Sequence, residues 1–123
     1  MSGSDVTFRP ATQRDFLAFY GRESPWTLRG AVAEMNGEIV GFGGVYFDQD
    51  TAMAFSDMRD TMRRKRKDVV RAARHLMALI RSFGVPVFAY ANPAEYTAPK
   101  LLARLGFEYI GSDRQGDLYR MDV

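Results

Sequence analysis

The chain has 123 residues, of which 46% are hydrophobic and 26% charged, and this composition predicts one globular domain over residues 1–123 and excludes a disordered chain. It has no cysteine and a single histidine, His75, which excludes disulfides, a thiol nucleophile and a multi-histidine metal site. The net charge is only +2, and no apolar run approaches the ~18 residues that span a bilayer, so we expect a cytoplasmic protein with no membrane partner.

The N-terminal half predicts a strand, a helix and an antiparallel meander of three strands. The expected elements are a strand over 7–10, a helix over 11–20 that ends at Gly21, and strands over 29–35, 38–47 and 51–58. The clearest signal is Asn36-Gly37, because a type I′ hairpin turn requires positive φ at both of its central residues.

The C-terminal half predicts alternating helices and strands. Apolar residues recur at spacings of three and four and indicate one buried helix face: Val69, Val70, Ala73, Leu76, Met77 and Ile80. The expected elements are helices over 61–83 and 95–105 and strands over 86–90, 107–112 and 118–123. The almost wholly apolar segment 86–90 is typical of a strand covered on both faces. We expect His75, between the apolar and charged faces of the first helix, to be partly buried and hydrogen-bonded.

A helical crossover between the strands 51–58 and 86–90 implies one parallel pair with a right-handed connection. The fold class is therefore α/β (α+β), with a mixed, mostly antiparallel central sheet and flanking helices.

The positive charge is concentrated in five consecutive basic residues, Arg63 to Lys67, which we call the basic block. Without it the acidic residues outnumber the basic ones. Three interpretations stay open: a solvated helix start, a site for phosphate groups, or a surface for nucleic acid or an acidic protein. Cations in the first turn of a helix oppose the helix dipole, and such local conflicts often mark functional sites.

The order of elements and one C-terminal segment resemble the GNAT superfamily of acyltransferases over nearly the whole chain. The segment comprises Ala98, Lys100-Leu101-Leu102 and Leu105-Gly106-Phe107-Glu108, and it is similar to the apolar helix that ends in Leu-Gly-Phe before a strand in that family. The resemblance implies a splayed parallel strand pair that holds acetyl-CoA or another acyl-CoA.

The resemblance also implies which residues contact this cofactor. Backbone groups of Phe55, Ser56 and Met58 would hold the pantetheine, and the turn before the long helix would hold the pyrophosphate. The remaining expected cofactor-binding residues are Arg64, Arg66, Lys67, Asp68, Val69 and Asn92. The sequence departs from the family at Lys67 and Val69, which stand where the family has a glycine and a small residue that let the backbone approach a phosphate.

Candidate catalytic residues lie on the meander and on the second helix. Glu34 and Asp57 lie on strands where acyltransferases of this shape place a general base, which would take a proton from an ammonium group. The family tyrosine that protonates the leaving thiolate is replaced by Leu102, so Tyr96, or Tyr90 before it, would have to substitute.

Two functions follow from these observations. The first is an acyl-CoA-dependent N-acyltransferase, in which a small-molecule or protein amine attacks the thioester directly. The alternative is a catalytically inactive GNAT-like module, associated with a phage virion, whose basic block binds nucleic acid or a virion protein. Small phage proteins of this fold resemble the chain at Asn92, Leu102, Gly106 and the basic residues 64–67.

Overall fold

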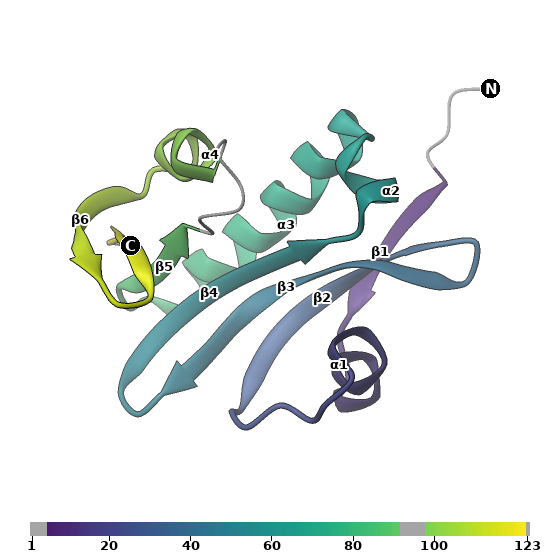
Figure 1. Ribbon diagram of the computed structural model, residues 1–123, viewed down its shortest axis with the longest axis horizontal. Helices are drawn as coiled ribbons and strands as arrows, with labels where there is room; N and C mark the ends of the chain where they lie inside the picture. The colour runs from purple at the N-terminus through teal and green to yellow at the C-terminus, as the bar shows by residue number, and fades with distance from the viewer. Residues whose placement is uncertain (1–4, 92–97, 123) are drawn as a thin grey trace.

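The strands of the protein form a single mixed sheet (Figure 1). The computed structural model describes residues 5–91 and 98–122. The strands are β1 (Val6–Pro10), β2 (Leu28–Met35), β3 (Glu38–Asp48), β4 (Thr51–Met58), β5 (Val87–Ala91), β6 (Glu108–Asp113) and β7 (Gly116–Met121). Their order in the sheet is β1-β2-β3-β4-β5-β7-β6, and only β4 and β5 pair in parallel. The mixed, mostly antiparallel sheet predicted from the sequence is confirmed.

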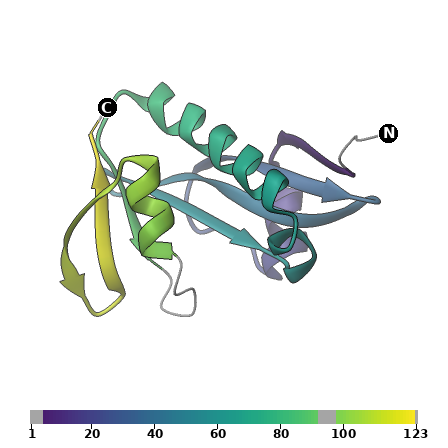
Figure 2. The same ribbon diagram turned by 90° about the horizontal axis from the view of Figure 1, so that it is seen from above.

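Helices cover both faces of this sheet (Figure 2). They are α1 (Gln13–Tyr20), α2 (Asp60–Arg63), α3 (Arg66–Phe83) and α4 (Ala98–Leu105). α1 places Phe16 and Phe19 against Val32 and Phe42 on one face. α3 and α4 pack together on the other face, against the buried side of β5. None of the helices in the described residues is long and apolar enough to cross a membrane.

Local signals in the sequence explain the N-terminal elements. α1 begins with a capping box, in which the Thr12 hydroxyl accepts from the Asp15 N–H and the Asp15 carboxylate accepts from the Thr12 N–H. It ends at Gly21, whose φ of 75° is left-handed. The β2–β3 hairpin turns at Asn36-Gly37, with φ values of 54° and 79°, as the sequence predicts.

The predicted single helix over 61–83 is wrong, because two helices occupy this segment. Arg64 is the C-terminal cap of α2, and Lys65, with φ −94° and ψ 82°, is the non-helical N-cap of α3. The basic block therefore spans a helix junction. Arg63 lies at the C-terminal end of α2, where a cation is favourable, and only Arg66 and Lys67 oppose the dipole of α3.

The buried face of α3 differs from the predicted one in two residues. Val70 is 50% exposed, whereas Asp68 is buried, with an ion pair to Arg71 at 2.8 Å. Arg71 also donates to the Val6 carbonyl oxygen at 3.2 Å, which ties α3 to β1. The prediction of a partly buried, hydrogen-bonded His75 is also wrong, since this side chain is exposed and its ring lies 4.7 Å from that of Phe8.

β5 is fully covered on one face only, contrary to the prediction. Val87, Ala89 and Ala91 are buried against α3 and α4, whereas Phe88 and Tyr90 on the other face are half-buried. None of the helices in the described part of the chain covers these two residues from the far side, since α1 lies over β2 and β3.

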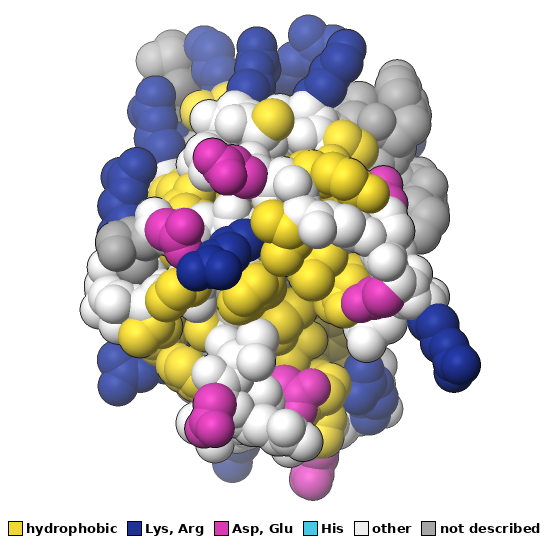
Figure 3. Space-filling view, turned by 90° about the vertical axis from the view of Figure 1, so that its left-hand side faces the viewer, with side chains coloured by type: hydrophobic (Ala, Val, Ile, Leu, Met, Phe, Trp, Pro, Cys, Tyr) yellow, Lys and Arg dark blue, Asp and Glu magenta, His cyan; other side chains and the backbone are white. Residues whose placement is uncertain are grey.

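The end of the molecule formed by the β6–β7 hairpin is chemically mixed (Figure 3). A patch of hydrophobic side chains lies at its centre and is crossed by a Lys or Arg side chain; acidic side chains lie around the patch, and further Lys and Arg side chains lie at the top and along both sides. β6 contributes exposed apolar side chains there, with Tyr109 56% and Ile110 48% exposed.

Candidate functional site

The parallel pair β4 and β5 separates soon after it forms. The two strands pair only at Ala52–Val87 and Met53–Phe88, and β5 continues in register with β7. From Ala54 onward, β4 has no partner strand on this side among the described residues. A strand edge inside a sheet leaves backbone N–H and C=O groups available to a ligand.

A cavity of about 290 Å³, which we call the splay cavity, occupies this separation between β4, β5, α3 and α4. Its lining is mostly apolar and comprises Ala54, Phe55, Ser56, Asp57, Met58, Arg63, Val69, Leu76, Ala89, Tyr90, Ala98, Leu101, Leu102, Leu105 and Phe107. The structure thus brings together five residues expected in the site: Phe55, Ser56, Asp57, Met58 and Val69.

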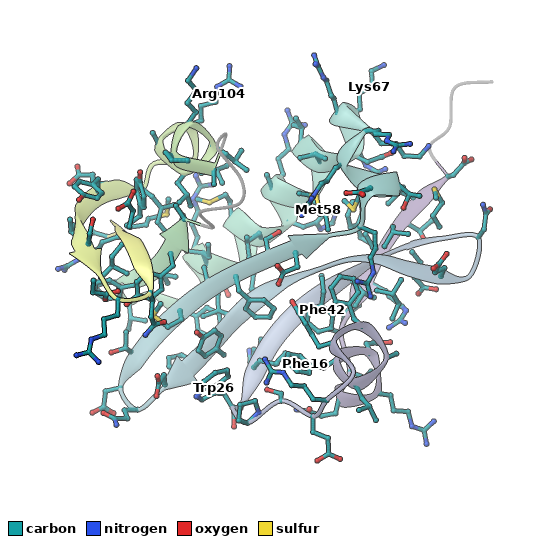
Figure 4. The ribbon with its side chains drawn as sticks, viewed as in Figure 1. Phe16, Trp26, Phe42, Met58, Lys67 and Arg104 are labelled. Atoms are coloured by element: carbon teal, nitrogen blue, oxygen red, sulfur yellow. The ribbon has the colours of Figure 1, made fainter. Side chains whose placement is uncertain are left out.

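Positive charge lies at one mouth of the splay cavity. Arg63 lines the cavity, and Lys67 on α3 and Arg104 on α4 project from the same side of the molecule (Figure 4). Arg64, Arg66 and Lys67 are exposed and do not line the cavity. Arg63 belongs to the basic block but was not among the residues expected to bind the cofactor, and Arg104 was not predicted at all.

The first turn of α3 offers less to a phosphate than the sequence suggested. The backbone N–H groups of Asp68 and Val69 both donate to the Lys65 carbonyl oxygen, at 3.0 Å. The Asp68 carboxylate accepts from Arg71 and so faces away from the cavity lining. Side-chain cations, rather than backbone donors of these two residues, are therefore the groups available to an anion.

Asp57 is linked to α1. Its carboxylate accepts a hydrogen bond of 2.6 Å from the Tyr20 hydroxyl, and the Tyr20 ring packs against Phe16 and Phe42. Burial, followed by the hydrogen bond to Asp57, raises the pKa of Tyr20 far above its usual value. Tyr20 therefore stays protonated and holds the Asp57 carboxylate in one orientation. Tyr20 could not be assigned to the site from the sequence, since no local pattern links residues that are 37 positions apart.

Asp57 also lines a second cavity, of about 490 Å³, between α3 and strands β1 to β4. We call this the α3 cavity. Its lining shares Ser56, Asp57, Met58 and Leu76 with the splay cavity.

Glu34, the other predicted base, lies elsewhere. Its carboxylate accepts a hydrogen bond from Arg9, and it lines neither cavity. The predicted residues Asn92 and Tyr96 lie outside the described residues.

Tyr90 is the tyrosine that lines the splay cavity among the described residues. Its hydroxyl donates to Asp113 at 2.5 Å, and this hydrogen bond raises the pKa of Tyr90 and lowers that of Asp113. Leu102 also lines the cavity, so the position where the family resemblance expects a tyrosine does face the site. The described residues hold no cluster of three or more His, Asp or Glu side chains that could bind a metal.

Comparisons with solved structures identify the architecture. An N-acetyltransferase from Staphylococcus aureus superposes on this chain with a TM-score of 0.70 at 16% sequence identity, and the alignment covers 97% of this chain and 99% of that one. The ribosomal-protein-S18-alanine N-acetyltransferase from Escherichia coli gives a TM-score of 0.67 at 17% identity, with 94% and 91% of the two chains covered.

A third similar structure is the PaiA N-acetyltransferase from Thermoplasma acidophilum in complex with coenzyme A. Its TM-score is 0.67 at 9% identity, with 98% of this chain and 100% of that chain covered. The chain has the GNAT fold. No protein-family model and no curated protein matches the sequence.

Proposed function

We propose that the protein is an acyl-CoA-dependent N-acyltransferase that uses acetyl-CoA or another acyl-CoA. The observation that carries the proposal is the splay cavity, where an unpaired stretch of β4 faces an apolar lining with Arg63 at its rim. An extended, amide-containing ligand such as pantetheine suits such a strand edge. One of the similar structures was solved with coenzyme A bound.

The residues present fit this ligand at the pantetheine end better than at the phosphate end. Phe55, Ser56 and Met58 would face the pantetheine. Lys67 and Val69 replace the small residues of the family pattern, so Arg63 and neighbouring cations would hold the phosphates by charge-assisted hydrogen bonds. Arg64, Arg66 and Lys67 contribute at longer range in this scheme.

The reaction is a direct transfer. The nitrogen lone pair of the amine attacks the thioester carbonyl carbon, the C–N bond forms, and the C–S bond breaks with its electron pair leaving on sulfur. Asp57, oriented by Tyr20, takes the proton lost from the amine, directly or through a water molecule. The departing thiolate takes up the hydroxyl proton of Tyr90, which lines the cavity, and the tyrosinate that remains regains a proton from solvent.

Calorimetry with acetyl-CoA tests the binding part of this proposal. We expect micromolar affinity in the wild type and a loss of at least about fivefold in Lys67→Glu, which reverses a charge at the mouth of the cavity. Leu102→Trp, which fills the cavity, should abolish binding while thermal melting confirms that the variant folds. Failure of acetyl-CoA to bind at millimolar concentration would contradict the proposal.

Release of free thiol from acetyl-CoA in the presence of a panel of primary amines tests the chemistry. Asp57→Asn should retain acetyl-CoA affinity and lower the transfer rate about a hundredfold, the usual size of a general-base contribution. Glu34→Gln is the matched control and should leave the rate unchanged. Equal rates in Asp57→Asn and wild type would remove Asp57 from the mechanism.

A second candidate function is a non-catalytic module that binds nucleic acid or a virion protein. The observation that favours it is the exposure of Arg64, Arg66 and Lys67 outside the cavity lining. Duplex DNA binding that weakens steeply with salt, and that is lost when these three residues are changed to serine, would support it. DNA affinity that is unchanged in this triple variant would contradict the second candidate.

A further inference from the structure

The α3 cavity is large and is not needed to hold coenzyme A itself. It lies under α3, whose Ala72, His75, Leu76 and Leu79 form its roof, and it has a volume of about 490 Å³. The cavity is partly open to solvent, and an apolar cavity of about 150 Å³ is already enough to bind benzene. A space of this size therefore suits an apolar ligand.

Small residues on three adjacent strands form its floor. Ala31 on β2, Gly43 on β3 and Ser56 on β4 are directly opposite one another in the sheet and all line the cavity. Because none of them has a long side chain, the space between sheet and helix stays open across three strands. The path from β4 to β2 covers two strand spacings, about 10 Å, roughly the length of an extended eight-carbon chain.

The cavity begins where the thioester would lie. Ser56, Asp57, Met58 and Leu76 line both cavities, so the α3 cavity and the splay cavity adjoin at these four residues. Most residues that line the cavity are apolar; among the polar ones, Arg9 and Asp57 hydrogen-bond to Asp15 and Tyr20, and Arg29 and His75 are exposed to solvent. The occupant that this geometry favours is an unbranched hydrocarbon chain attached at the Ser56 end.

We propose that the acyl group transferred by this protein is a medium-length fatty acyl chain of about eight carbons, and that the α3 cavity holds it. This inference rests on the proposed acyl-CoA function and names the class of its donor substrate. The acyl chain passes beneath Leu76 and lies over Gly43 toward Ala31. Acetyl-CoA would bind through the coenzyme alone and leave the α3 cavity empty.

The affinities for coenzyme A, acetyl-CoA and octanoyl-CoA, measured by calorimetry, test the acyl-chain proposal separately from the acyltransferase proposal. Burial of each additional methylene favours binding by up to about fourfold, so octanoyl-CoA should bind at least about tenfold more tightly than acetyl-CoA. Equal affinity for the two would overturn the acyl-chain proposal and leave the acyltransferase proposal standing. Absence of binding by all three would overturn both.

Variants of the cavity test its location. Ala31→Leu fills the far end and should bring octanoyl-CoA to within about twofold of acetyl-CoA, with acetyl-CoA affinity unchanged. Ala78→Leu makes the same change on the exposed face of α3 and should keep the full preference for octanoyl-CoA.

Leu79→Ala enlarges the cavity and supplies an independent test if Ala31→Leu does not fold. It should shift the preferred donor from octanoyl-CoA toward dodecanoyl-CoA. An unchanged chain-length preference in the folded cavity variants would place the acyl chain elsewhere and overturn the proposal.

Discussion

Asp15 combines two local roles in one buried carboxylate. It closes the capping box of α1 with Thr12, and it accepts two hydrogen bonds from the Arg9 guanidinium at 2.7 and 2.8 Å. The hydrogen bond from Arg9 is the main reason that the pKa of Asp15 lies well below its usual range. The charge on Asp15 therefore joins the N-terminus of α1 to β1.

This arrangement predicts a pH-dependent contribution to stability. Because the pKa of Asp15 is lower in the folded than in the unfolded chain, its stabilisation is present above pH ~4, the unfolded value, and is lost as the pH falls toward the folded value. Asp15→Asn should lower the free energy of unfolding by about 2 kcal/mol at pH 7, with a difference that shrinks below pH ~4.

Urea denaturation of both proteins between pH 7 and pH 3 measures this difference. Asp60→Asn is the control, since the Asp60 side chain is 79% exposed and its ion pair with Arg63 is 3.4 Å long. Asp60→Asn should lower the free energy of unfolding by less than about 0.5 kcal/mol at any pH. A loss in Asp15→Asn that is the same at pH 7 and pH 3 would contradict the role of its charge.

The Tyr20–Asp57 hydrogen bond gives a second prediction about a single residue. Tyr20 acts through Asp57 and is a positioning residue, so Tyr20→Phe should lower kcat about fivefold to tenfold and leave the KM for acyl-CoA unchanged. In an Asp57→Asn background, Tyr20→Phe should have no further effect on kcat.

Tyr46→Phe is the matched control for this cycle. It removes the hydroxyl of another tyrosine, whose ring stacks on Trp26 and contacts Phe55. The hydrogen bond from Tyr20 to Asp57 is left in place. Additive effects of Tyr20→Phe and Asp57→Asn on kcat would show that the two side chains act independently.

The break between α2 and α3 determines how the basic block is used. Met62, on α2, is 1% exposed and packs with Val6, Ala33 and Val40. Its sulfur lies 2.7 Å from where a Cβ on Gly41 would stand, so Gly41 makes room for it. With Met62 anchored in the sheet, α2 ends at Arg63, and this cation comes to line the splay cavity.

Substitution of two adjacent arginines should therefore lower the affinity for coenzyme A to different extents. Arg63→Gln should weaken coenzyme A binding about tenfold, because a charge-assisted hydrogen bond to phosphate is lost. Arg64→Gln, one residue on and outside the lining, should weaken it about twofold or less. Calorimetry on both variants, with thermal melting to establish folding, gives the answer; equal losses would mean that the block acts only through its overall charge.

How well the elements could be predicted depends on whether their causes are local. The β2–β3 hairpin follows from Asn36-Gly37 alone, and the register of the meander follows from it. No glycine or proline marks the break at Arg64-Lys65, and the nearby contact of Met62 with Gly41 joins residues that are distant in the sequence. Likewise, the sequence placed Asp57 in the site, but its partner Tyr20 comes from another element.

Positive charge is unevenly distributed over the molecule. Lys and Arg side chains gather on the side where α3 and α4 flank the splay cavity, whereas the β6–β7 end carries both acidic and basic side chains around its apolar patch (Figures 3 and 4). A phosphate-bearing donor is attracted to the first side. The small net charge of +2 conceals this concentration of cations.

Salt dependence distinguishes these contributions in the intact protein. Affinity for coenzyme A should fall about tenfold between 50 mM and 500 mM NaCl, because exposed cations attract its phosphates and added ions screen them. Affinity for pantetheine, which carries no phosphate, should change less than about twofold over the same range. If both ligands lost affinity equally, the basic side of the molecule would have no part in holding the donor, and its cations would be free to serve a different polyanion. If salt weakened the binding of coenzyme A alone, separate parts of the fold would hold the two parts of the ligand. The cations at the mouth of the splay cavity would hold the phosphates, and the open edge of β4 would hold the pantetheine.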